Sequence, residues 1–481
     1  MYFYPKKIAE TKLIARDVSL IGFWFGMLML IPMLVGIIYG EPGWPMYLPI
    51  VLFTSGLSYI LMRGFKEDEK PFTHMTIVTL AVIWIMSCLF GSLPFVIAGG
   101  MGPLDGLFES VSSISTAGLT TIQGVESIPH SVLFWRAMLA WLGGIGITAI
   151  AFYSILQSES ISKIVLGEGY DRLRPSLVNS AKEIFKIYGF WTLLGIVGLS
   201  LIGTPVFDAF NISMNAISTT GVDVHTEGWQ YYQRTMPETF GIMTAIVALL
   251  MIMGAISFIA HYRVLKNRKL RLYLEDRETL AYLVILVVGM LIVGVYVAAS
   301  GQNPGPMTYE AMSTSTTGGF EISPYMTAGA SHFIMGILII LSLIGGCTNS
   351  AAGGIKVKRI YVLFKYFLWK AGRQISPQGE ISHFRYEGKK MALGQITDIG
   401  VYVFIYFVAI VIIASLMMVF EYDAVDSVLT VASAQAGGGV SAIPGWELNA
   451  PVKLGLIATM LFGRLEFIPL FALGAYALRR Y

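Results

Sequence analysis

Long apolar segments separated by short polar ones dominate this chain. Eight stretches are almost free of charged residues, and they cover residues 18–39, 75–98, 134–156, 190–203, 240–260, 280–299, 401–420 and 454–478. A helix needs about 20 apolar residues to cross the hydrocarbon core of a bilayer. Most of these stretches reach that length, and flanking residues complete the shorter ones. The pattern predicts an all-α integral membrane protein whose first helix is retained and not removed as a signal peptide.

The composition agrees with a membrane protein, and the few cysteines and histidines are widely scattered. Hydrophobic residues make up 55% of the 481 positions and charged residues 13%, whereas soluble domains carry about a quarter charged residues. The two cysteines, Cys88 and Cys347, fall in different apolar segments, and the six histidines are scattered singly. Neither a disulfide framework nor a cysteine or histidine metal site is therefore expected.

One glycine-rich run could suggest a nucleotide loop. Gly143-Gly144-Ile145-Gly146 lies inside an apolar segment and no strand precedes it, which favours close helix packing instead. The sequence also offers no nucleophile–base pair and no metal constellation. We therefore expect no enzymatic activity and no bound organic cofactor.

The basic residues indicate which connections face the cytoplasm. If the N-terminus is cytoplasmic, the inner segments are residues 1–17, 62–75, 158–188, 262–278, 356–398 and 479–480. They hold 29 of the 33 Lys and Arg residues, which is a strong positive-inside bias and places both termini in the cytoplasm. The outer segments have a net charge of −11. This charge either concentrates cations near an entrance or only solvates the loops.

Four short segments rich in small and hydroxyl-bearing residues resemble one another. They are Ser115-Thr116-Ala117-Gly118, Ser218-Thr219-Thr220-Gly221, Ser315-Thr316-Thr317-Gly318 and Ala434-Gln435-Ala436-Gly437, with glycines 103, 97 and 119 residues apart. The residues before each segment suit a helix of about three turns, which is too short to span a membrane. Each repeat therefore consists of an outer helix, a half-helix entering from outside, a glycine loop and an inner helix.

The repeats divide the chain into five parts. Two extra transmembrane helices occupy residues 1–70, and the four repeats occupy residues 71–160, 161–270, 271–390 and 391–481. Irregular backbone at membrane depth is tolerated only where protein buries it or water lines it. Four loops of the same orientation are most simply satisfied around one axis. We therefore predict four parallel helix–pore-loop–helix repeats around a central pore.

The glycine loops carry groups that can replace the water shell of K⁺. Backbone carbonyl oxygens can form such a cage, glycine tolerates the conformations that aim them at an axis, and hydroxyl groups add further oxygens. Half-helix C-termini add a partial negative charge. The predicted K⁺-binding filter residues are Thr116, Ala117, Gly118, Thr219, Thr220, Gly221, Thr316, Thr317, Gly318, Gln435, Ala436 and Gly437.

A second irregular segment follows the inner helix of the third repeat. That helix, from Ser331 to Ile344, is only about 21 Å long, so the small and polar residues 345–354 begin inside the membrane and should line a cavity. The predicted gate residues are Gly345, Gly346, Cys347, Thr348, Asn349, Ser350, Gly353, Gly354 and Arg464. Arg464 is expected to face this segment, hold it in place and repel K⁺ when the pore is shut. The alternative is a structural arginine that pairs with helix-end carbonyl groups.

These features resemble the Trk/Ktr/HKT superfamily of K⁺ transport proteins, and most closely its TrkH branch. The resemblance runs from about Phe72 to the C-terminus and includes the small-residue loop and a Gly-Arg-Leu-Glu motif at residues 463–466. Relatives with serine in the first loop tend toward Na⁺, so glycine there favours K⁺. The fourth loop departs from the family pattern, because Gln435 replaces a threonine. The resemblance implies a filter lined by Gly118, Gly221, Gly318 and Gly437.

The resemblance also implies partners and a location. It implies a homodimer with one pore per subunit in a prokaryotic cytoplasmic membrane, and control by a cytoplasmic TrkA-type nucleotide-binding ring. The basic residues 356–390 could instead bind anionic lipid headgroups or an acidic protein surface, and no nucleic acid is expected. The expected function is channel-like K⁺ uptake gated by the intramembrane loop. A Na⁺- or H⁺-coupled K⁺ symporter is the alternative.

Overall fold

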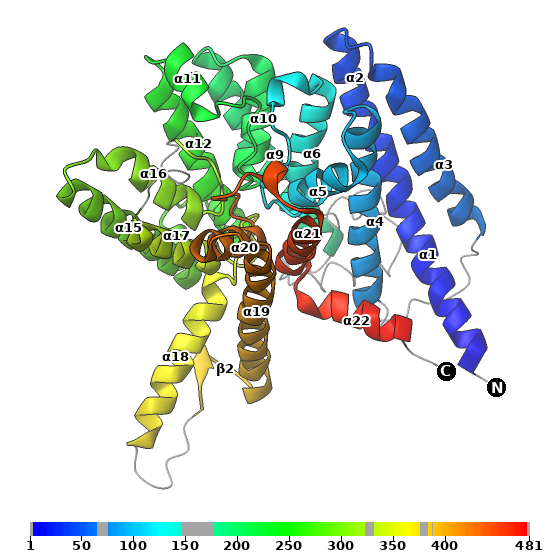
Figure 1. The fold of residues 1–481 in the computed structure, drawn as a ribbon. Coiled ribbons are helices and arrows are strands. Elements are labelled where there is room, and N and C mark those ends of the chain that lie inside the picture. The colour runs from blue at the N-terminus through cyan, green and yellow to red at the C-terminus, as the bar shows by residue number, and fades with distance from the viewer. Residues whose placement is uncertain are drawn as a thin grey trace.

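Most of the described residues are helical, and the helices form one body from which a hairpin protrudes (Figure 1). The computed structural model describes residues 3–64, 76–146, 177–322, 331–375, 383–386 and 388–478. The first helices are α1 (Phe3–Leu28), α2 (Leu30–Ile38), α3 (Tyr47–Gly64), α4 (Thr76–Ile97), α5 (Pro103–Ile114), α6 (His130–Ile145), α9 (Leu177–Leu201), α10 (Val206–Ile217), α11 (Trp229–Thr235) and α12 (Phe240–Ala255). They are followed by α13 (Phe258–Asn267), α14 (Leu272–Glu275), α15 (Arg277–Ala299), α16 (Pro304–Ser315), α17 (His332–Ile344), α18 (Val357–Gln374), α19 (Leu393–Val419), α20 (Ala424–Ala436), α21 (Ala450–Leu465) and α22 (Phe467–Leu478). Two short strands, β1 (Arg385–Tyr386) and β2 (Lys389–Lys390), pair antiparallel.

The described residues contain enough apolar helices for a multi-pass membrane protein. Six spans are long and apolar enough on their own: Glu10–Ile38, Trp44–Gly64, Ile77–Ile97, Lys182–Leu201, Arg277–Ala299 and Leu393–Val419. Two further pairs, α12 with α13 and α21 with α22, bend by 102° and 110° and raise the number to eight if each counts as one span. Large apolar side chains such as Leu52, Leu193 and Phe404 are exposed on the outer helices, which suits contact with lipid rather than water.

A long helix, a short helix and an inner helix recur four times along the chain. The four units are α4–α5–α6, α9–α10–α12, α15–α16–α17 and α19–α20–α21. Within this series, α6 packs on α10, α12 on α16, α17 on α20, and α21 on α5. The contacts between units are therefore cyclic, because each inner helix touches the short helix of the next unit. The inner helix α17 has only 13 residues, in agreement with the early stop that its sequence predicts.

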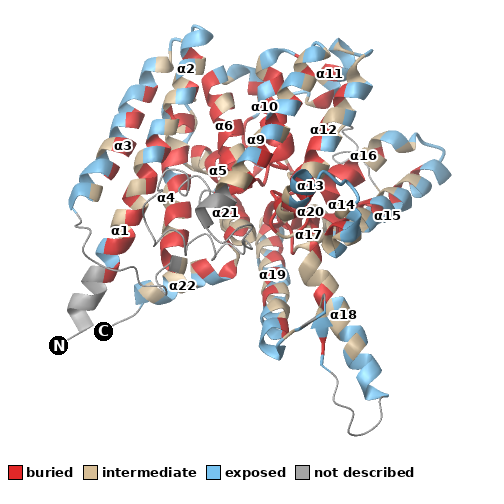
Figure 2. Cartoon of the chain, turned by 180° about the vertical axis from the view of Figure 1, so that it is seen from behind, coloured by how far each residue is buried: buried red, intermediate tan, exposed pale blue. Residues whose placement is uncertain are grey.

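The remaining elements lie at the periphery of this arrangement. Helices α1 and α3 pack together beside α4, and α22 lies across the end of α4 (Figure 1). Buried residues are concentrated where the four units meet, and exposed ones follow the outer surfaces (Figure 2). The predicted domain boundaries at residues 70 and 160 lie outside the described residues.

Both ends of the chain lie toward the side of the molecule from which the hairpin projects. Helices α18 and α19 extend away from the body there, joined through the two strands (Figure 1). The Thr11 hydroxyl of α1 lies 3.0 Å from the Tyr476 hydroxyl of α22, which ties the first helix to the last. The opposite side carries the loops that follow the short helices.

Candidate ion pathway

The short helices α5, α10, α16 and α20 end with the same backbone geometry. One residue in each adopts a left-handed conformation: Thr116 (φ 60°), Thr219 (φ 55°), Thr317 (φ 55°) and Gly437 (φ 75°). The N–H of the following residue then donates to the carbonyl five positions back, and these four bonds join Ala117 to Ser112, Thr220 to Asn215, Gly318 to Ser313 and Gly438 to Ser433 at 2.7–2.8 Å. This is a Schellman-type helix end. Three of the left-handed residues are threonines, a costly choice that is typical of functional sites.

This common geometry corrects the sequence alignment of the third and fourth loops. The residue two positions beyond the left-handed one is Gly118, Gly221, Gly319 or Gly439. The sequence motif instead equated Gly318 and Gly437 with the first two glycines. The motif alignment is shifted in these two loops because α16 continues to Ser315 and α20 to Ala436. Each of these loops therefore begins later in the sequence than the motif indicates. The sequence did contain a signal of this shift, because further glycines follow the third and fourth motifs.

The four glycines meet in one place. A Cβ atom placed on Gly118 would lie 3.0 Å from the Gly221 nitrogen and 3.1 Å from the Gly439 Cα. A Cβ on Gly221 would lie 2.2 Å from the carbonyl carbon of Gly319, and one on Gly439 would lie 3.1 Å from the Gly319 Cα. The contacts run in the order 118, 221, 319, 439 and back to 118. We call these four residues the glycine ring, and no side chain fits at any of its positions without displacing backbone.

Polar side chains of the short helices support the backbone just beyond the ring. Ser112 Oγ donates to the Leu119 carbonyl, and Asn215 Nδ2 donates to the Val222 carbonyl at 2.8 Å. Ser433 Oγ accepts from the Val440 N–H at 2.8 Å. These donors and acceptors occupy matching positions, four residues before the left-handed residue. The loops therefore leave the ring along similar paths.

The predicted filter residues separate into those near the ring and those inside helices. The buried loop residues that adjoin the ring are Thr116, Ala117, Thr219, Thr220, Thr317 and Gly318. Thr316 caps α16, and Ala436 lies in the last turn of α20. Gln435 lies in the same turn, and its amide donates to the Tyr406 carbonyl of α19 at 3.1 Å. Its side chain therefore braces α20 against α19.

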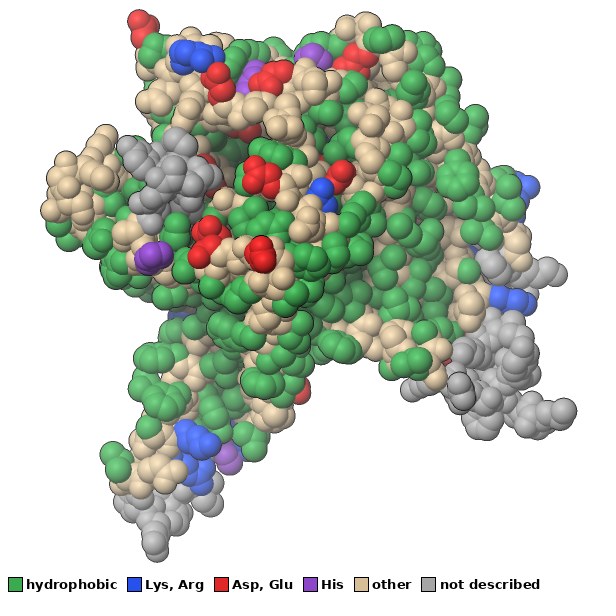
Figure 3. Space-filling model, viewed as in Figure 1, with side chains coloured by type: hydrophobic (Ala, Val, Ile, Leu, Met, Phe, Trp, Pro, Cys, Tyr) green, Lys and Arg blue, Asp and Glu red, His purple; other side chains and the backbone are tan. Residues whose placement is uncertain are grey.

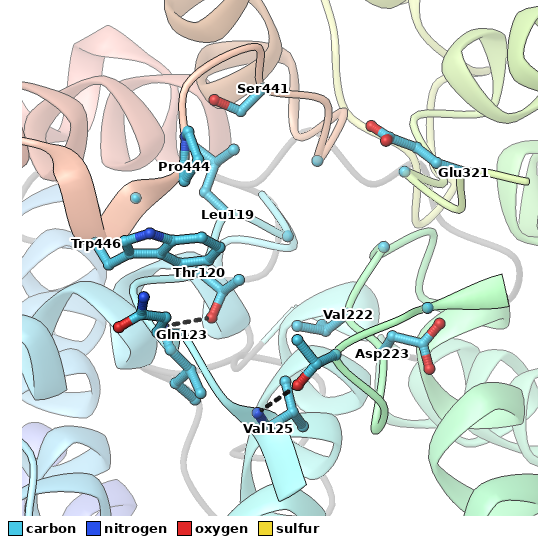
Figure 4. A pocket seen from close by; sticks show the side chains of 18 of the residues that line it. Leu119, Thr120, Gln123, Val125, Val222, Asp223, Glu321, Ser441, Pro444 and Trp446 are labelled. Carbon is cyan, nitrogen blue, oxygen red and sulfur yellow. Dashed lines mark hydrogen bonds between the residues drawn. The ribbon is translucent and has the colours of Figure 1, made fainter. Parts of the chain in front are cut away.

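A cavity of about 360 Å³ opens above the glycine ring. Acidic side chains surround a hollow on this part of the molecule (Figure 3). Two residues beyond each ring glycine stand Thr120, Asp223, Glu321 and Ser441, which line the cavity from four different loops (Figure 4). Burial raises the pKa of Asp223 to about 6 and that of Glu321 to about 7. The sequence motifs do not include these residues, although their fixed distance from the ring glycines could have revealed them.

Residues 345–354 form an irregular loop between α17 and α18 that packs under the glycine loops. The N–H groups of Cys347 and Ala351 donate to the carbonyls of Ala255 and Gly254, both at 2.9 Å, where α12 ends. The N–H of Gly353 donates to Oγ1 of Thr317, also at 2.9 Å. The loop is thus attached to the second inner helix and to the third glycine loop.

Three charged side chains hold this loop from other directions. Arg464 Nη1 donates to the Ala351 carbonyl at 2.9 Å, and Nη2 donates to the Gly143 and Gly144 carbonyls at the end of α6. The sequence predicted that Arg464 faces either this loop or helix-end carbonyl groups, and in the structure it contacts both. Glu278 accepts from the Thr348 N–H, and Lys356 donates to the Ala352 carbonyl. No motif in the sequence points to Glu278 or Lys356.

Comparison with known proteins identifies the family. The sequence model of the TrkH family, described as a cation transport protein, matches residues 65–298 and 277–478. The chain is 29% identical over 485 residues to the Trk system potassium uptake protein TrkH of Salmonella typhimurium, with 96% of this chain and 97% of that protein covered. It is 27% identical over 458 residues to an uncharacterized cation transporter of Methanocaldococcus jannaschii, with 94% and 92% covered.

A solved structure has the same fold. The crystal structure of the potassium transporter TrkH from Vibrio parahaemolyticus superposes with a TM-score of 0.84 at 24% identity, covering 96% of this chain and 98% of that chain. The family model spans most of the sequence, and the relatives align over nearly their full length. This membrane protein therefore belongs to the TrkH family of cation transport proteins.

Proposed function

We propose that the chain is a K⁺ uptake subunit whose four helix–loop–helix units surround one pore. The observation that carries the proposal is the glycine ring, in which four loops from distant parts of the chain meet without side chains. The cyclic contacts among the units support a shared axis. The relatives include potassium uptake proteins, which supports K⁺ as the ion.

The proposed filter consists of carbonyl oxygens around Gly118, Gly221, Gly319 and Gly439. Such oxygens replace the water shell that K⁺ loses on entry. The short helices end at the ring, so their C-terminal dipoles favour a cation. On the outer side, the carboxyl groups of Asp223 and Glu321 line the mouth and attract cations before dehydration.

We also propose that residues 345–354 are the gate. The loop packs directly beneath the glycine loops, through the Gly353–Thr317 bond. Arg464 holds it against the end of α6 and places a positive charge in the path of the ion. Channel-like permeation through such a gate is the favoured mode. An ion-coupled symporter remains the alternative. Such transporters often contain inverted repeats, whereas here each unit has the same order of long helix, short helix and inner helix.

The proposed partners act on the side that carries the hairpin. Basic and aromatic side chains, among them Lys370, Arg373 and Trp369, line a cavity of about 590 Å³ between α18 and α19. We propose that this side is cytoplasmic and receives a TrkA-type nucleotide-binding ring, that lipid surrounds the outer helices, and that two copies assemble as a homodimer. The location proposed is a prokaryotic cytoplasmic membrane with both termini inside.

An ion flux assay with purified protein in liposomes tests this proposal. Wild type should pass K⁺ down its own gradient without a second driving ion, and should prefer K⁺ to Na⁺. Gly118→Ser and Gly319→Ser should lose much of this preference, because their side chains meet backbone of neighbouring loops. Gly318→Ser is the matched control, because its Cβ would meet only the Met251 side chain and its own loop's Thr316 Oγ1 within 3.0 Å.

The outcomes separate the alternatives. Equal permeation of K⁺ and Na⁺ in wild type would discard the filter assignment. Dependence of K⁺ uptake on a Na⁺ or H⁺ gradient would favour the symporter. If Gly318→Ser loses selectivity and Gly319→Ser keeps it, the assignment of Gly319 to the ring is wrong.

A further inference from the structure

Behind the first two glycine loops, two opposite charges are enclosed within the protein. Glu109 of α5 is fully buried, and Arg136 of α6 is 2% exposed. Charged side chains are rarely buried this deeply unless they are paired. The proposed filter and gate use neither of them.

Glu109 holds the loop of its own unit. Its Oε1 accepts hydrogen bonds from Oγ1 of Thr120 at 2.8 Å and from both the N–H and Oγ1 of Thr121. Thr120 stands two residues beyond the ring residue Gly118. The carboxylate therefore fixes the backbone at the point where the first loop leaves the ring.

Arg136 connects this carboxylate to the second loop. Its Nη1 lies 3.9 Å from Glu109 Oε2 and 3.5 Å from Thr120 Oγ1. Its Nη2 donates to the backbone carbonyl of Asp223, two residues beyond Gly221. One guanidinium group thus joins the outer ends of two adjacent loops. The planar fork of arginine suits this arrangement, because its donors point in several fixed directions.

The inner helices share a register that allows these positions to be compared between units. A Cβ on Gly143, Gly254 or Gly463 would collide with the carbonyl of Ile114, Ile217 or Gln435, respectively. Each of those carbonyls lies two residues before the left-handed residue of its loop. Equivalent positions can therefore be counted from these glycines and from the left-handed residues.

In the second and fourth units, the equivalents of the charged pair carry no charge. Counting back seven residues from the left-handed residue of each loop gives Glu109 in the first unit, Ile212 in the second and Thr430 in the fourth. Counting back seven residues from the inner-helix glycine gives Arg136, Val247 and Leu456 in the same units. All four of these uncharged residues are buried. The same layer of the molecule thus packs well without a charged pair.

The third unit keeps the carboxylate at this place. Glu310 stands seven residues before Thr317, and its Oε1 accepts from the Ile322 N–H at 2.7 Å. This bond matches the one that Glu109 receives from the Thr121 N–H. A carboxylate that holds its own loop therefore recurs, whereas the arginine that reaches the next loop belongs to the first unit.

Stability alone does not account for the charged pair. Burying two charges removes them from water, and apolar residues of similar volume often stabilise a fold equally well or better. The second unit has such an apolar pair at this place. The charged pair instead adds directional contacts. The guanidinium group can hold Thr120 and the Asp223 carbonyl at a fixed separation, whereas an apolar contact can slide.

We propose that Arg136, oriented by Glu109, is a positioning residue that fixes the outer ends of the first and second loops and thereby sets the K⁺/Na⁺ discrimination. This inference rests on the proposed filter function. A carbonyl cage discriminates between ions through its size and through the number and field of its oxygens. A brace on two of its four corners limits how far the cage relaxes around the smaller Na⁺.

The test compares permeability ratios of full-length protein in liposomes. Arg136→Met removes the brace, and Glu109→Ile with Arg136→Val copies the buried apolar pair Ile212 and Val247 of the second unit. Arg136→Lys retains the charge but cannot make all the contacts. Arg234→Met is the matched control, because Arg234 is an exposed basic residue paired with Glu227 at 2.9 Å. Thermal unfolding is measured for every variant.

The K⁺/Na⁺ permeability ratio should fall about tenfold in Arg136→Met and in the double variant, which corresponds to ~1.4 kcal/mol of differential stabilisation. The double variant should remain folded at the assay temperature. Arg136→Lys should lie between, and Arg234→Met should match wild type. An equal ratio in wild type and in the folded double variant would overturn the inference, as would K⁺ and Na⁺ fluxes that change in parallel. A wild type without discrimination would overturn the proposed function as well.

Discussion

At the scale of single residues, titratable groups line the cavity above the glycine ring, and the proposed function predicts that ion uptake depends on external pH. Asp223 has a pKa raised to about 6 and Glu321 one raised to about 7, both through burial. His225 lines the same cavity and has a raised pKa: burial lowers it, but hydrogen bonding and attraction to Asp208 outweigh that. As the pH falls from 8 to 5, both carboxyl groups lose their charge and His225 gains one. The mouth therefore becomes less negative on acidification.

We expect K⁺ uptake at low ionic strength to slow on the order of tenfold over this range, because steering of a cation depends on the local potential. Initial uptake rates into liposomes at external pH 8 and pH 5 measure the effect. Added salt should reduce it by screening. Asp223→Asn with Glu321→Gln should flatten the profile. A rate that rises on acidification, or a double variant with the wild-type profile, would contradict this assignment.

The residues of the glycine ring, which is the proposed filter, were only partly predictable from the sequence. Four short runs of small and polar residues that end in glycine indicated where all four loops lie. In the first two loops, that final glycine is the ring glycine. In the third and fourth loops it is not, because the register depends on where α16 and α20 end, and helix boundaries are the least reliable feature to predict from sequence. The Glu109–Arg136 pair shows no local signal, since its two residues lie on different helices.

At the scale of elements, the loop of residues 345–354 depends on its links to neighbouring helices. Arg464 bridges the Ala351 carbonyl and the end of α6. Arg464→Ala removes both the bridge and the charge, and we expect the closed-state K⁺ leak to rise on the order of tenfold, because the three charge-assisted hydrogen bonds of the guanidinium group are lost. Flux without any regulator present measures the leak.

A second variant separates the bridge from the charge. Arg464→Lys keeps the charge but cannot reach both acceptors in the same geometry. A leak close to that of the alanine variant would assign the effect to the bridge, whereas a wild-type leak would assign it to charge. An alanine variant that leaks no more than wild type would remove Arg464 from the gate.

Elements followed from the sequence where length and apolarity decide them. Five of the predicted apolar stretches overlap helices that are long and apolar enough to cross a membrane, and they are residues 18–39, 75–98, 190–203, 280–299 and 401–420. The short α17 agrees with its expected early end. The stretch at residues 134–156 extends past α6 into residues outside the described ones. The bends of 102° between α12 and α13 and 110° between α21 and α22 were not, because residues 240–260 and 454–478 read as continuous apolar stretches. Tertiary contacts supply the bends, including the Phe258 N–H bond to the Asn349 carbonyl at 2.8 Å.

At the scale of the whole molecule, the cyclic packing of the four units brings loops together that are about a hundred residues apart in sequence. Parallel orientation of the repeats predicted that they share an axis, but not the order or the contact partners. Those emerge only from helix packing, in which α21 closes the series against α5. The glycine ring is thus a property of the assembled fold.

The location of a permeant heavy ion tests this account most directly. Rb⁺ or Tl⁺ can replace K⁺, and anomalous diffraction from crystals grown with either ion shows where it binds. We predict a peak on the axis enclosed by Gly118, Gly221, Gly319 and Gly439, lost in crystals grown with Na⁺ alone. Peaks confined to other parts of the protein, with none among these glycines, would contradict the central claim.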